Sequence, residues 1–476
     1  MKKIRIIPRL DIKGQNVIKG IHLEGLRIVG KPAELAKRYY EQGADEILYM
    51  DIVASLYERE NILEIVRETT SLGVFIPITV GGGIRTLEDI KKTLRAGADK
   101  VAINTFAVKN PEFIKEAAKM FGAQCIVGSI EAKKTETGWE AYIENGREKT
   151  GLNAIDWAKK LVELGVGELL VTSIDQEGTE KGYDLELIKK IVSEVSVPVI
   201  ACGGAKNSKN IRLCLEETKC DAVALASLLH YNETTVSEIK KYLKKQNLEI
   251  REKYKTLKNS SGDGIKKVIS IVDYGLGNLQ SVVKGFEKVS NPVKIVNTPE
   301  EIFNAENLVL PGVGAFEDGM KGLRERNLIK SIKKHVELKK PLLGICLGAQ
   351  LLFSESEEFG IHKGLNLIKG KVVKFKKSDS LEKKYLIPHI GWDSISFSED
   401  KKSENILKDT PKNSEMYFVH SFVLVPENKE NILATTIYGE REFCSLVKKD
   451  NIYGCQFHPE KSGEAGLKIL EAFGTM

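Results

Sequence analysis

IPITVGGGIRTLEDIKKTL (76–94) and VPVIACGGAKNSKNIRLCL (197–215) decide the fold of the first half of the chain. Each stretch is a short apolar run that ends in glycines and leads into an amphipathic, helix-forming segment. The second copy lies about 120 residues after the first. ADKVAINT (98–105) and CDAVALAS (220–227) repeat at a similar spacing. The repeats predict a barrel made of two fused halves, with similar packing of strand-end loops as the alternative explanation.

The alternation of apolar runs with helical stretches continues along the first 250 residues. Eight such units in this length are typical of a (β/α)8 TIM barrel. A doubly wound open sheet is the alternative, although it more often has fewer strands. The predicted strands lie near Ile4–Leu10, Glu46–Ile52, Phe75–Val80, Lys100–Ile103, Cys125–Ile130, Glu168–Ile174, Val197–Ala201 and Ala222–Ala226.

A charged segment without apolar periodicity, REKYKTLKNSSGDGIKK (251–267), separates this barrel from a second patterned region. We predict a barrel domain at 1–250, a linker at 251–266 and a second domain at 267–476. The second domain opens with a strand, a glycine-rich turn and a helix. Further strands are expected near Asn307–Leu310, Pro341–Ile345 and Ile452–Phe457. These elements predict an α/β domain with a central, largely parallel sheet.

Composition narrows the class of protein. Of 476 residues, 42% are hydrophobic and 29% are charged, with a net charge of +6, which indicates a globular protein suited to a small anionic substrate. Neither nucleic acid nor membrane partners are expected, because dense basic stripes and long apolar runs are lacking. The seven cysteines contain no CxxC pair, which fits reduced thiols and gives no zinc pattern. We therefore expect a cytoplasmic protein.

The strongest local motif is PLLGICLGAQLLF (341–353), in which an apolar strand runs through a glycine turn into a helix. This pattern predicts a nucleophile elbow with Cys346 at the turn, where the helix N-terminus favours the thiolate. YGCQFHPEKSG (453–463) supplies His458 as general base and Glu460 as its orienting carboxylate. The alternatives are a buried structural cysteine and a surface histidine without a catalytic role. The occurrence of Cys346, His458 and Glu460 together disfavours them.

A third segment, LVLPGVGAF (308–316), ends a strand in a glycine turn. Its exposed backbone N–H groups at Gly312, Val313 and Gly314 predict an oxyanion hole, with an ordinary strand-end turn as the alternative.

The second domain resembles the class I, or triad, glutamine amidotransferases over essentially its whole length. DYGLGN (273–278), PHIGWD (388–393) and YFVHSF (417–422) are similar to the glutaminase subunit family of imidazole glycerol phosphate synthases. The resemblance implies that Cys346 forms a γ-glutamyl thioester, that His458 moves the proton and that Gln350 lies in the glutamine pocket. His389 and His420 are isolated, and the family uses no metal, so no metal or other cofactor is expected.

Glycines at two equivalent strand ends of the barrel carry the next signal. Gly82 and Gly83 follow one strand, Gly203 and Gly204 follow its repeat, and bare backbone amides there can bind phosphate. Two such cradles predict a substrate with a phosphate at each end. Asn104 and Thr105 would complete one cradle, and Ala226 and Ser227 the other.

Asp11 and Glu131 end the first and fifth predicted strands, which face each other across a barrel. Two converging carboxyl groups suit general acid–base catalysis, whereas two solvated strand-end carboxylates are the alternative.

The barrel domain is similar to the cyclase subunit family of imidazole glycerol phosphate synthases. RIIPRLDIK (5–13), VGGGIRTLEDI (80–90), GADKVAINT (97–105), TSIDQEGTEKGYDLELI (172–188) and ACGGAKN (201–207) carry the resemblance. It implies that ammonia splits a bis-phosphorylated ribulosyl-aminoimidazole carboxamide intermediate into imidazole glycerol phosphate and aminoimidazole carboxamide ribotide. It also implies that Lys19, Thr172 and Gly178 contact the substrate.

The same family passes ammonia from the glutaminase through the barrel, sheltered from solvent. The resemblance places its entrance ring at Arg5, Glu46, Lys100 and Glu168, and a pair between the two domains at Asp99 and Lys461. The expected partners are thus glutamine, a phosphorylated acceptor and the other domain of the same chain.

The departures from the family cluster on the substrate side of the barrel. Arg9 stands where a small residue is usual, Glu131 and Glu177 stand where aspartate is usual, and the loop HLEGLRIVGKP (22–32) is altered. The sequence therefore leaves two enzymatic functions open: the synthase of histidine biosynthesis, or a paralogue that delivers ammonia to another acceptor, such as a sugar of surface polysaccharides. A non-enzymatic role is a third hypothesis, against which the complete Cys346, His458 and Glu460 set argues.

Overall fold

The computed structural model describes residues 3–21, 24–52, 59–252, 265–375, 385–402 and 405–476. The described residues up to Glu252, together with Leu386–Pro388, form one compact unit, and the remaining described residues from Ile265 onward form the other. Most of the linker predicted at 251–266 lies outside the described residues.

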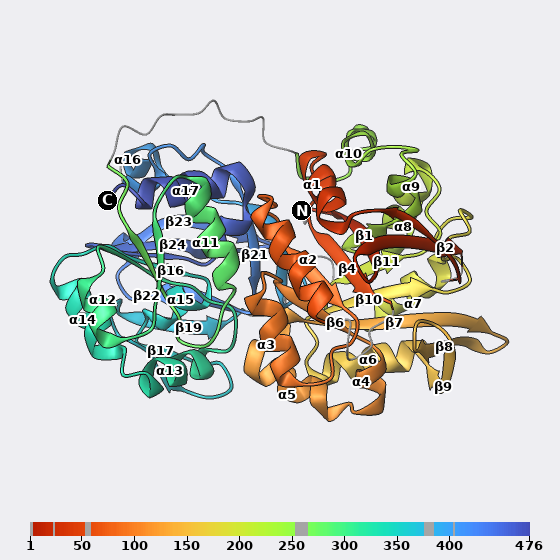
Figure 1. Cartoon of the computed structure of the whole chain (residues 1–476), viewed down its shortest axis with the longest axis horizontal. Coiled ribbons are helices and arrows are strands. Elements are labelled where there is room, and N and C mark those ends of the chain that lie inside the picture. The colour runs from red at the N-terminus through yellow and green to blue at the C-terminus, as the bar shows by residue number, and fades with distance from the viewer. Residues whose placement is uncertain (1–2, 22–23, 53–58, 253–264, 376–384, 403–404) are drawn as a thin grey trace. The chain divides into compact units, whose positions relative to one another are not determined.

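The first unit is a closed barrel of eight parallel strands, as predicted (Figure 1). The ring closes because β10 pairs with β7 in parallel, from Glu168 opposite Val127 to Ser173 opposite Ala132. The barrel strands, in order around the ring, are β1 (Arg5–Lys13), β4 (Ile47–Asp51), β5 (Ile78–Gly81), β6 (Lys100–Ile103), β7 (Ile126–Thr135), β10 (Glu168–Ser173), β11 (Val199–Cys202) and β12 (Ala222–Leu225).

Side chains from alternate strand positions fill the barrel. Ile7 of β1 belongs to an interior apolar cluster with residues of the other strands, including Leu48, Leu170 and Ile200. Because side chains alternate between the two faces of a strand, Arg5, Arg9 and Asp11 share the inward face of Ile7. One strand therefore brings three charged side chains into the barrel at successive levels.

Helices follow the barrel strands and lie outside them (Figure 1). Several begin at side-chain caps, such as Thr86, whose hydroxyl accepts from Asp89 N while Asp89 accepts from Thr86 N. The helices are α1 (Pro32–Glu41), α2 (Arg59–Ser71), α3 (Leu87–Arg95), α4 (Thr105–Lys109), α5 (Glu112–Phe121), α6 (Ala154–Leu164), α7 (Leu185–Glu194), α8 (Ser208–Thr218), α9 (Ser227–His230) and α10 (Val236–Lys245), with a 3-10 turn η1 at Ala123–Cys125.

Two antiparallel extensions grow from the ends of β1 and β7, which are equivalent strands of the two halves. β2 (Asn16–Ile21) and β3 (Glu24–Gly30) extend β1, and β8 (Gly138–Ile143) and β9 (Glu148–Asn153) extend β7. The prediction of a loop at 22–32 is wrong for the described residues 24–32, because most of them form strand β3, which pairs with β2. Pairing with β2 satisfies backbone groups that a loop would leave to water.

The main sheet of the second unit is mixed. We expected a largely parallel sheet, and only about half of its strands are parallel. Five strands are parallel, and the others pair mostly antiparallel, beginning where β24 meets β25. In sheet order the strands are β14 (Val293–Val296), β13 (Ile269–Val272), β15 (Asn307–Leu310), β16 (Leu342–Ile345), β25 (Ile452–Cys455), β24 (Arg441–Lys449), β22 (Phe422–Pro426), β19 (Gly370–Lys374), β17 (Glu355–Ser356) and β18 (His362–Lys363), with β23 (Ile432–Tyr438) beside β24.

A separate pair, β20 (His389–Ser394) and β21 (Glu415–His420), and several helices complete this unit. Helices α11 and α17 lie side by side (Figure 1). The helices are α11 (Leu279–Lys288), α12 (Pro299–Asn304), α13 (Phe316–Glu325), α14 (Ile329–Glu337), α15 (Leu347–Leu351), α16 (Glu399–Lys402) and α17 (Gly463–Phe473), with 3-10 turns at Asn405–Leu407, Lys429–Asn431 and Pro459–Lys461. Among the described residues of the whole chain, none of the helices combines the length and apolar character needed to cross a membrane.

Candidate active sites

Cys346 stands at a sharp turn between β16 and α15 in the second unit. Its backbone has φ 49° and ψ −105°, a conformation that residues with a Cβ rarely adopt and that costs energy to hold. The Cys346 N–H donates to Cys455 O of the neighbouring strand at 2.7 Å, which ties the turn to β25. This strained strand–turn–helix is the geometry of a nucleophile elbow.

His458 and Glu460 follow the neighbouring strand, β25. The His458 imidazole Nδ1 and Glu460 Oε1 are 2.8 Å apart, and both side chains are buried. Nε2 of His458 has no hydrogen-bond partner among the described residues. Burial alone would lower the pKa of His458, but the charges of Glu460 and Cys346 outweigh it and raise the pKa well above its ordinary value. The arrangement favours a protonated imidazole at His458, held by Glu460 beside the cysteine.

The predicted oxyanion turn packs directly on the elbow. A Cβ added at Gly312 would lie 2.3 Å from Gly348 N, and one added at Gly348 would lie 1.9 Å from Leu310 O. Gly277, in the glycine turn after β13, would place its Cβ 3.7 Å from the N atoms of Gly312 and Val313. Three segments far apart in the sequence therefore bring bare backbone together near Cys346.

Gln350 lies in α15, one turn beyond the cysteine. Its Nε2 is 3.4 Å from both Phe422 O and Gln456 Oε1, and Gln456 Nε2 donates to Cys346 Sγ at 3.8 Å. The sequence analysis missed Gln456, although its place two residues before His458 could have marked it.

Glu358 is a second residue that the sequence analysis missed. Its carboxylate accepts from Phe316 N at 2.7 Å, at the end of the predicted oxyanion turn. Burial raises the pKa of Glu358 to about 7. No local sequence signal marks it, because its contact spans 42 residues.

His389 and His420 form a chain of polar contacts on the strand pair β20–β21. His389 contacts Asp393 Oδ2 at 2.7 Å and His420 at 3.1 Å, and His420 contacts Phe422 O at 2.8 Å. Burial and the neighbouring His389 lower the pKa of His420 well below its ordinary value, so His420 is a neutral imidazole.

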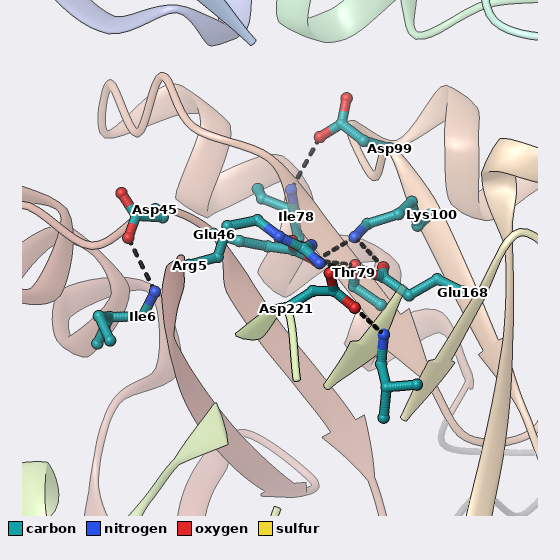
Figure 2. A network of polar contacts seen from close by, with 11 residues as sticks. Arg5, Ile6, Asp45, Glu46, Ile78, Thr79, Asp99, Lys100, Glu168 and Asp221 are labelled. Carbon is teal, nitrogen blue, oxygen red and sulfur yellow. Dashed lines mark hydrogen bonds and ion pairs between the residues drawn. The ribbon is translucent and has the colours of Figure 1, made fainter. Parts of the chain in front are cut away.

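In the barrel, the four residues predicted to form a charged ring do meet (Figure 2). Arg5 contacts Glu46 at 3.0 Å and also contacts Glu168, while Lys100 contacts Glu46 at 2.7 Å and Glu168 at 2.6 Å. Burial alone would raise the pKa of Glu168, but Arg5 and Lys100 outweigh it and bring the pKa to about 2. Each cation is therefore paired with both anions, which offsets the cost of burying them.

Three aspartates near this ring accept hydrogen bonds from backbone N–H groups of a neighbouring strand (Figure 2). Asp45 also pairs with Lys240 and Arg251. Asp45 accepts from Ile6 N, Asp99 from Ile78 N and Asp221 from Val199 N, at 2.7–2.8 Å. Each aspartate thus joins two neighbouring barrel strands. Asp99 has this contact within the barrel, and its pairing with Lys461 stays a prediction.

At the opposite ends of the strands, Asp11 and Glu131 have different surroundings. Asp11 Oδ1 accepts from Arg9 Nε at 2.8 Å, and Lys19 Nζ lies 3.6 Å from its other oxygen. Among the side chains of the described residues, Glu131 Oε2 accepts one hydrogen bond, from the uncharged amide Nδ2 of Asn104 at 3.1 Å. Burial raises the pKa of Glu131 to about 7, whereas Arg9 and Lys19 outweigh burial and lower the pKa of Asp11.

The two predicted phosphate cradles have the left-handed backbone conformation that glycine adopts readily. Gly82, Gly83, Gly203 and Gly204 all have positive φ, between 66° and 102°. A Cβ at Gly82 would lie 2.2 Å from Asp51 O, so the turn requires glycine there. The second turn borders a cavity of about 20 Å³ lined by residues that include Gly178, Gly203, Gly204, Ala226 and Ser227.

Other predicted substrate contacts are occupied by protein groups. Thr172 Oγ1 accepts from Arg9, Lys19 pairs with Glu177, and Asn104 also donates to Tyr142 O at 3.1 Å. Asn104 and Ala226 begin α4 and α9 with nearly equal dihedral angles (φ −118° and −124°, ψ −83° and −87°), which reflects the repeat of the two half-barrels.

Comparisons with known proteins agree with both units. Residues 5–235 match the family described as "Histidine biosynthesis protein", and residues 270–475 match "Glutamine amidotransferase class-I". The protein described as "Imidazole glycerol phosphate synthase subunit HisF" from Legionella pneumophila is 62% identical over 205 residues, which cover 43% of this chain and 96% of that protein.

Two further HisF subunits are similar over nearly their full length. The one from Methanococcus maripaludis is 48% identical over 268 residues, covering 52% of this chain and 98% of its own. The one from Trichormus variabilis is 49% identical over 251 residues, covering 52% of this chain and 97% of its own. The chain therefore belongs to the imidazole glycerol phosphate synthase HisF family, with its HisF-type cyclase domain joined to a class-I glutamine amidotransferase domain.

Proposed function

We propose that this chain is a glutamine-dependent imidazole glycerol phosphate synthase of histidine biosynthesis. Its second unit hydrolyses glutamine, and its barrel uses the ammonia. The observation that carries the proposal is the occurrence, in one HisF-family chain, of a strained Cys346 elbow beside a paired His458–Glu460 and of a barrel with two buried carboxyl groups on strands that face each other.

In the glutaminase reaction, the Cys346 thiolate attacks the side-chain amide of glutamine, and the oxyanion that forms is bound by backbone N–H groups at Gly312–Gly314. His458 gives its proton to the leaving ammonia, and a γ-glutamyl thioester remains. Water then hydrolyses the thioester to glutamate, with His458 as base. Gln350, one helical turn from Cys346, lines the glutamine pocket.

In the barrel reaction, the acceptor is the bis-phosphorylated ribulosyl-aminoimidazole carboxamide. One phosphate binds at Gly82, Gly83 and Asn104, and the other binds at Gly203, Gly204, Ala226 and Ser227. Asp11 and Glu131 handle the protons between these ends, and Lys19, Thr172 and Gly178 complete the substrate contacts. The products are imidazole glycerol phosphate and aminoimidazole carboxamide ribotide.

Ammonia reaches the acceptor through the barrel. It enters at the ring of Arg5, Glu46, Lys100 and Glu168, and passes the apolar interior around Ile7 and Leu170. A route through the barrel keeps ammonia away from water, where it would be protonated and diluted.

One observation favours a second candidate function. The Arg9 guanidinium fills the barrel interior below the carboxylates, where it contacts Asp11, Thr172 and Cys202. A bulky buried cation here changes the space and charge that an acceptor meets. The second candidate is therefore the transfer of ammonia to a different acceptor, such as a sugar of surface polysaccharides.

A steady-state assay with glutamine and the bis-phosphorylated intermediate separates the two candidates. Coupled formation of imidazole glycerol phosphate and glutamate is expected for the histidine pathway. Cys346→Ala should abolish the glutamine-dependent reaction and retain the reaction driven by ammonium salts. Glutamine hydrolysis without turnover of the intermediate would reject the histidine-pathway candidate and favour the other acceptor.

A further inference from the structure

Arg9 separates the surroundings of the two barrel carboxyl groups. It lies on β1, two residues before Asp11, and is buried with an exposed fraction of 2%. Its Nε donates to Asp11 at 2.8 Å, and its Nη1 donates to Thr172 Oγ1 at 3.1 Å and to Cys202 Sγ at 3.2 Å. Contacts with three strands, β1, β10 and β11, fix the guanidinium in one place.

Asp11 therefore faces cations from more than one element. Arg9 bonds it from its own strand, and Lys19 lies 3.6 Å away on β2. Lys19 is itself paired with Glu177. His230, at the end of α9, also interacts with Asp11, but burial lowers the pKa of His230 to about 4, so it is neutral near pH 7. Protonating Asp11 would leave the buried Arg9 without its carboxylate, which is costly.

Glu131 faces no direct cation contact among the described residues. Asn104 Nδ2 and the backbone N–H of Gly146 donate to it. The charge of Arg9 lowers the pKa of Glu131, and the charge of Asp11 raises it. Its side chain is buried. A buried carboxyl with neutral donors accepts a proton more readily than one that is ion-paired.

We infer that Arg9 is a positioning residue that keeps Asp11 a carboxylate throughout the barrel reaction and leaves Glu131 as the carboxyl that gives and regains the proton. The inference rests on the proposed use of these two carboxyl groups in ammonia transfer. Glu131 enters as the acid and gives its proton to the group that leaves the acceptor. The attacking ammonia loses a proton as its new bond to carbon forms, and Glu131 takes that proton. Asp11 accepts hydrogen bonds from ammonia or acceptor and stays anionic.

The test is a titration that needs no turnover. The full chain is labelled with ¹³C at aspartate and glutamate side-chain carboxyl carbons, and the two signals are assigned by their loss in Asp11→Asn and Glu131→Gln. We expect the Glu131 signal to titrate near 7, far above the ordinary 4.5. The Asp11 signal should remain that of a carboxylate across the same range.

Variants at Arg9 add a matched comparison. Arg9→Gln removes the cation, so the pKa of Asp11 should rise, and that of Glu131 should rise further because Arg9 lowers it. Arg9→Lys keeps a cation and should leave the order of the two titrations unchanged. Titration of Asp11 near neutral pH in the unmodified chain, or of Glu131 near 4.5, would overturn the inference.

With an acceptor that reacts, the pH dependence of kcat tests the role of Arg9 independently of the titration. At saturating ammonia, kcat should depend on one group that titrates near 7, and Arg9→Gln should add a second ionisation. Failure of the bis-phosphorylated intermediate to react would count against the proposed function and leave the titration result standing. A single unchanged ionisation in Arg9→Gln would contradict the role of Arg9.

Discussion

At the scale of single residues, the glutaminase site depends on one strained position and one buried pair. The positive φ of Cys346 holds its side chain above the turn, and the tie to Cys455 O prevents relaxation into an ordinary loop. His458 depends in turn on Glu460, which contacts its Nδ1. Removing the carboxylate charge should therefore affect catalysis more than folding.

Glu460→Gln should lower glutaminase kcat by about 10²-fold or more, since the imidazolium loses its stabilising charge. Glu460 raises the pKa of His458, so its removal lets the imidazolium deprotonate at lower pH. The alkaline limb of the pH–rate profile should move to lower pH, measured as glutamate release. Glu464→Gln, at the start of α17, is the control. An unchanged alkaline limb would show that Glu460 does not act on His458.

At the scale of elements, the glutaminase site depends on close approach between the turn after β15 and the elbow before α15. Gly348→Ala would place a Cβ 1.9 Å from Leu310 O, so one of the two segments must move. We expect loss of glutamine hydrolysis by at least about 10²-fold, because the oxyanion donors shift.

The matched control for this change is Gly319→Ala in α13, whose added Cβ would meet only side-chain ends and no backbone, with Leu351 at 3.2 Å and Leu347 at 3.4 Å. It should retain most of the glutaminase activity. Equal loss in both variants would mean that the effect is general destabilisation, which denaturant unfolding of the two variants measures.

The charged ring of the barrel gives a stability prediction at the same scale. Glu168→Ala leaves Arg5 and Lys100 to share Glu46, and breaking such a buried network costs about 3–5 kcal/mol in the free energy of unfolding. Glu186→Ala, whose partner Lys134 is exposed, should cost less than about 1 kcal/mol. Denaturant unfolding followed by circular dichroism compares the two, and similar losses would contradict the assigned role of the ring.

The ring also sets a pH dependence. The folded pKa of Glu168 is about 2, below the ordinary 4.5, so its contribution is complete above 4.5 and disappears as pH falls through the folded value. The difference in unfolding free energy between the unmodified chain and Glu168→Ala should therefore shrink between these pH values.

At the scale of the whole molecule, the proposed passage of ammonia requires both reactions to stay coupled. With saturating glutamine and acceptor, glutamate and barrel product should form in equal amounts even when an enzyme trap consumes ammonia in solution. The ratio is measured by chromatography in the presence and absence of the trap. A fall in product with trap concentration would show that ammonia leaves the protein before it reacts.

Fold prediction succeeded where the signal was local and repeated. Each barrel strand is an apolar run before a helical stretch, and the shift of about 120 residues gave the two-fold relation of the halves. The strand at Glu24–Gly30 was missed because its pairing partner, not its own composition, makes it a strand. The antiparallel half of the second sheet was missed for the same reason.

The sequence by itself determined the eight-stranded barrel, the family and the identity of the chemical groups, because short motifs and periodicity encode them locally. Only the tertiary structure decided which groups meet. Arg9 reaches Thr172 and Cys202 across 163 and 193 residues, and Glu358 reaches the turn at Phe316 from the turn between β17 and β18. The different surroundings of Asp11 and Glu131 arise from burial and from these distant contacts, and a pattern along one chain records neither.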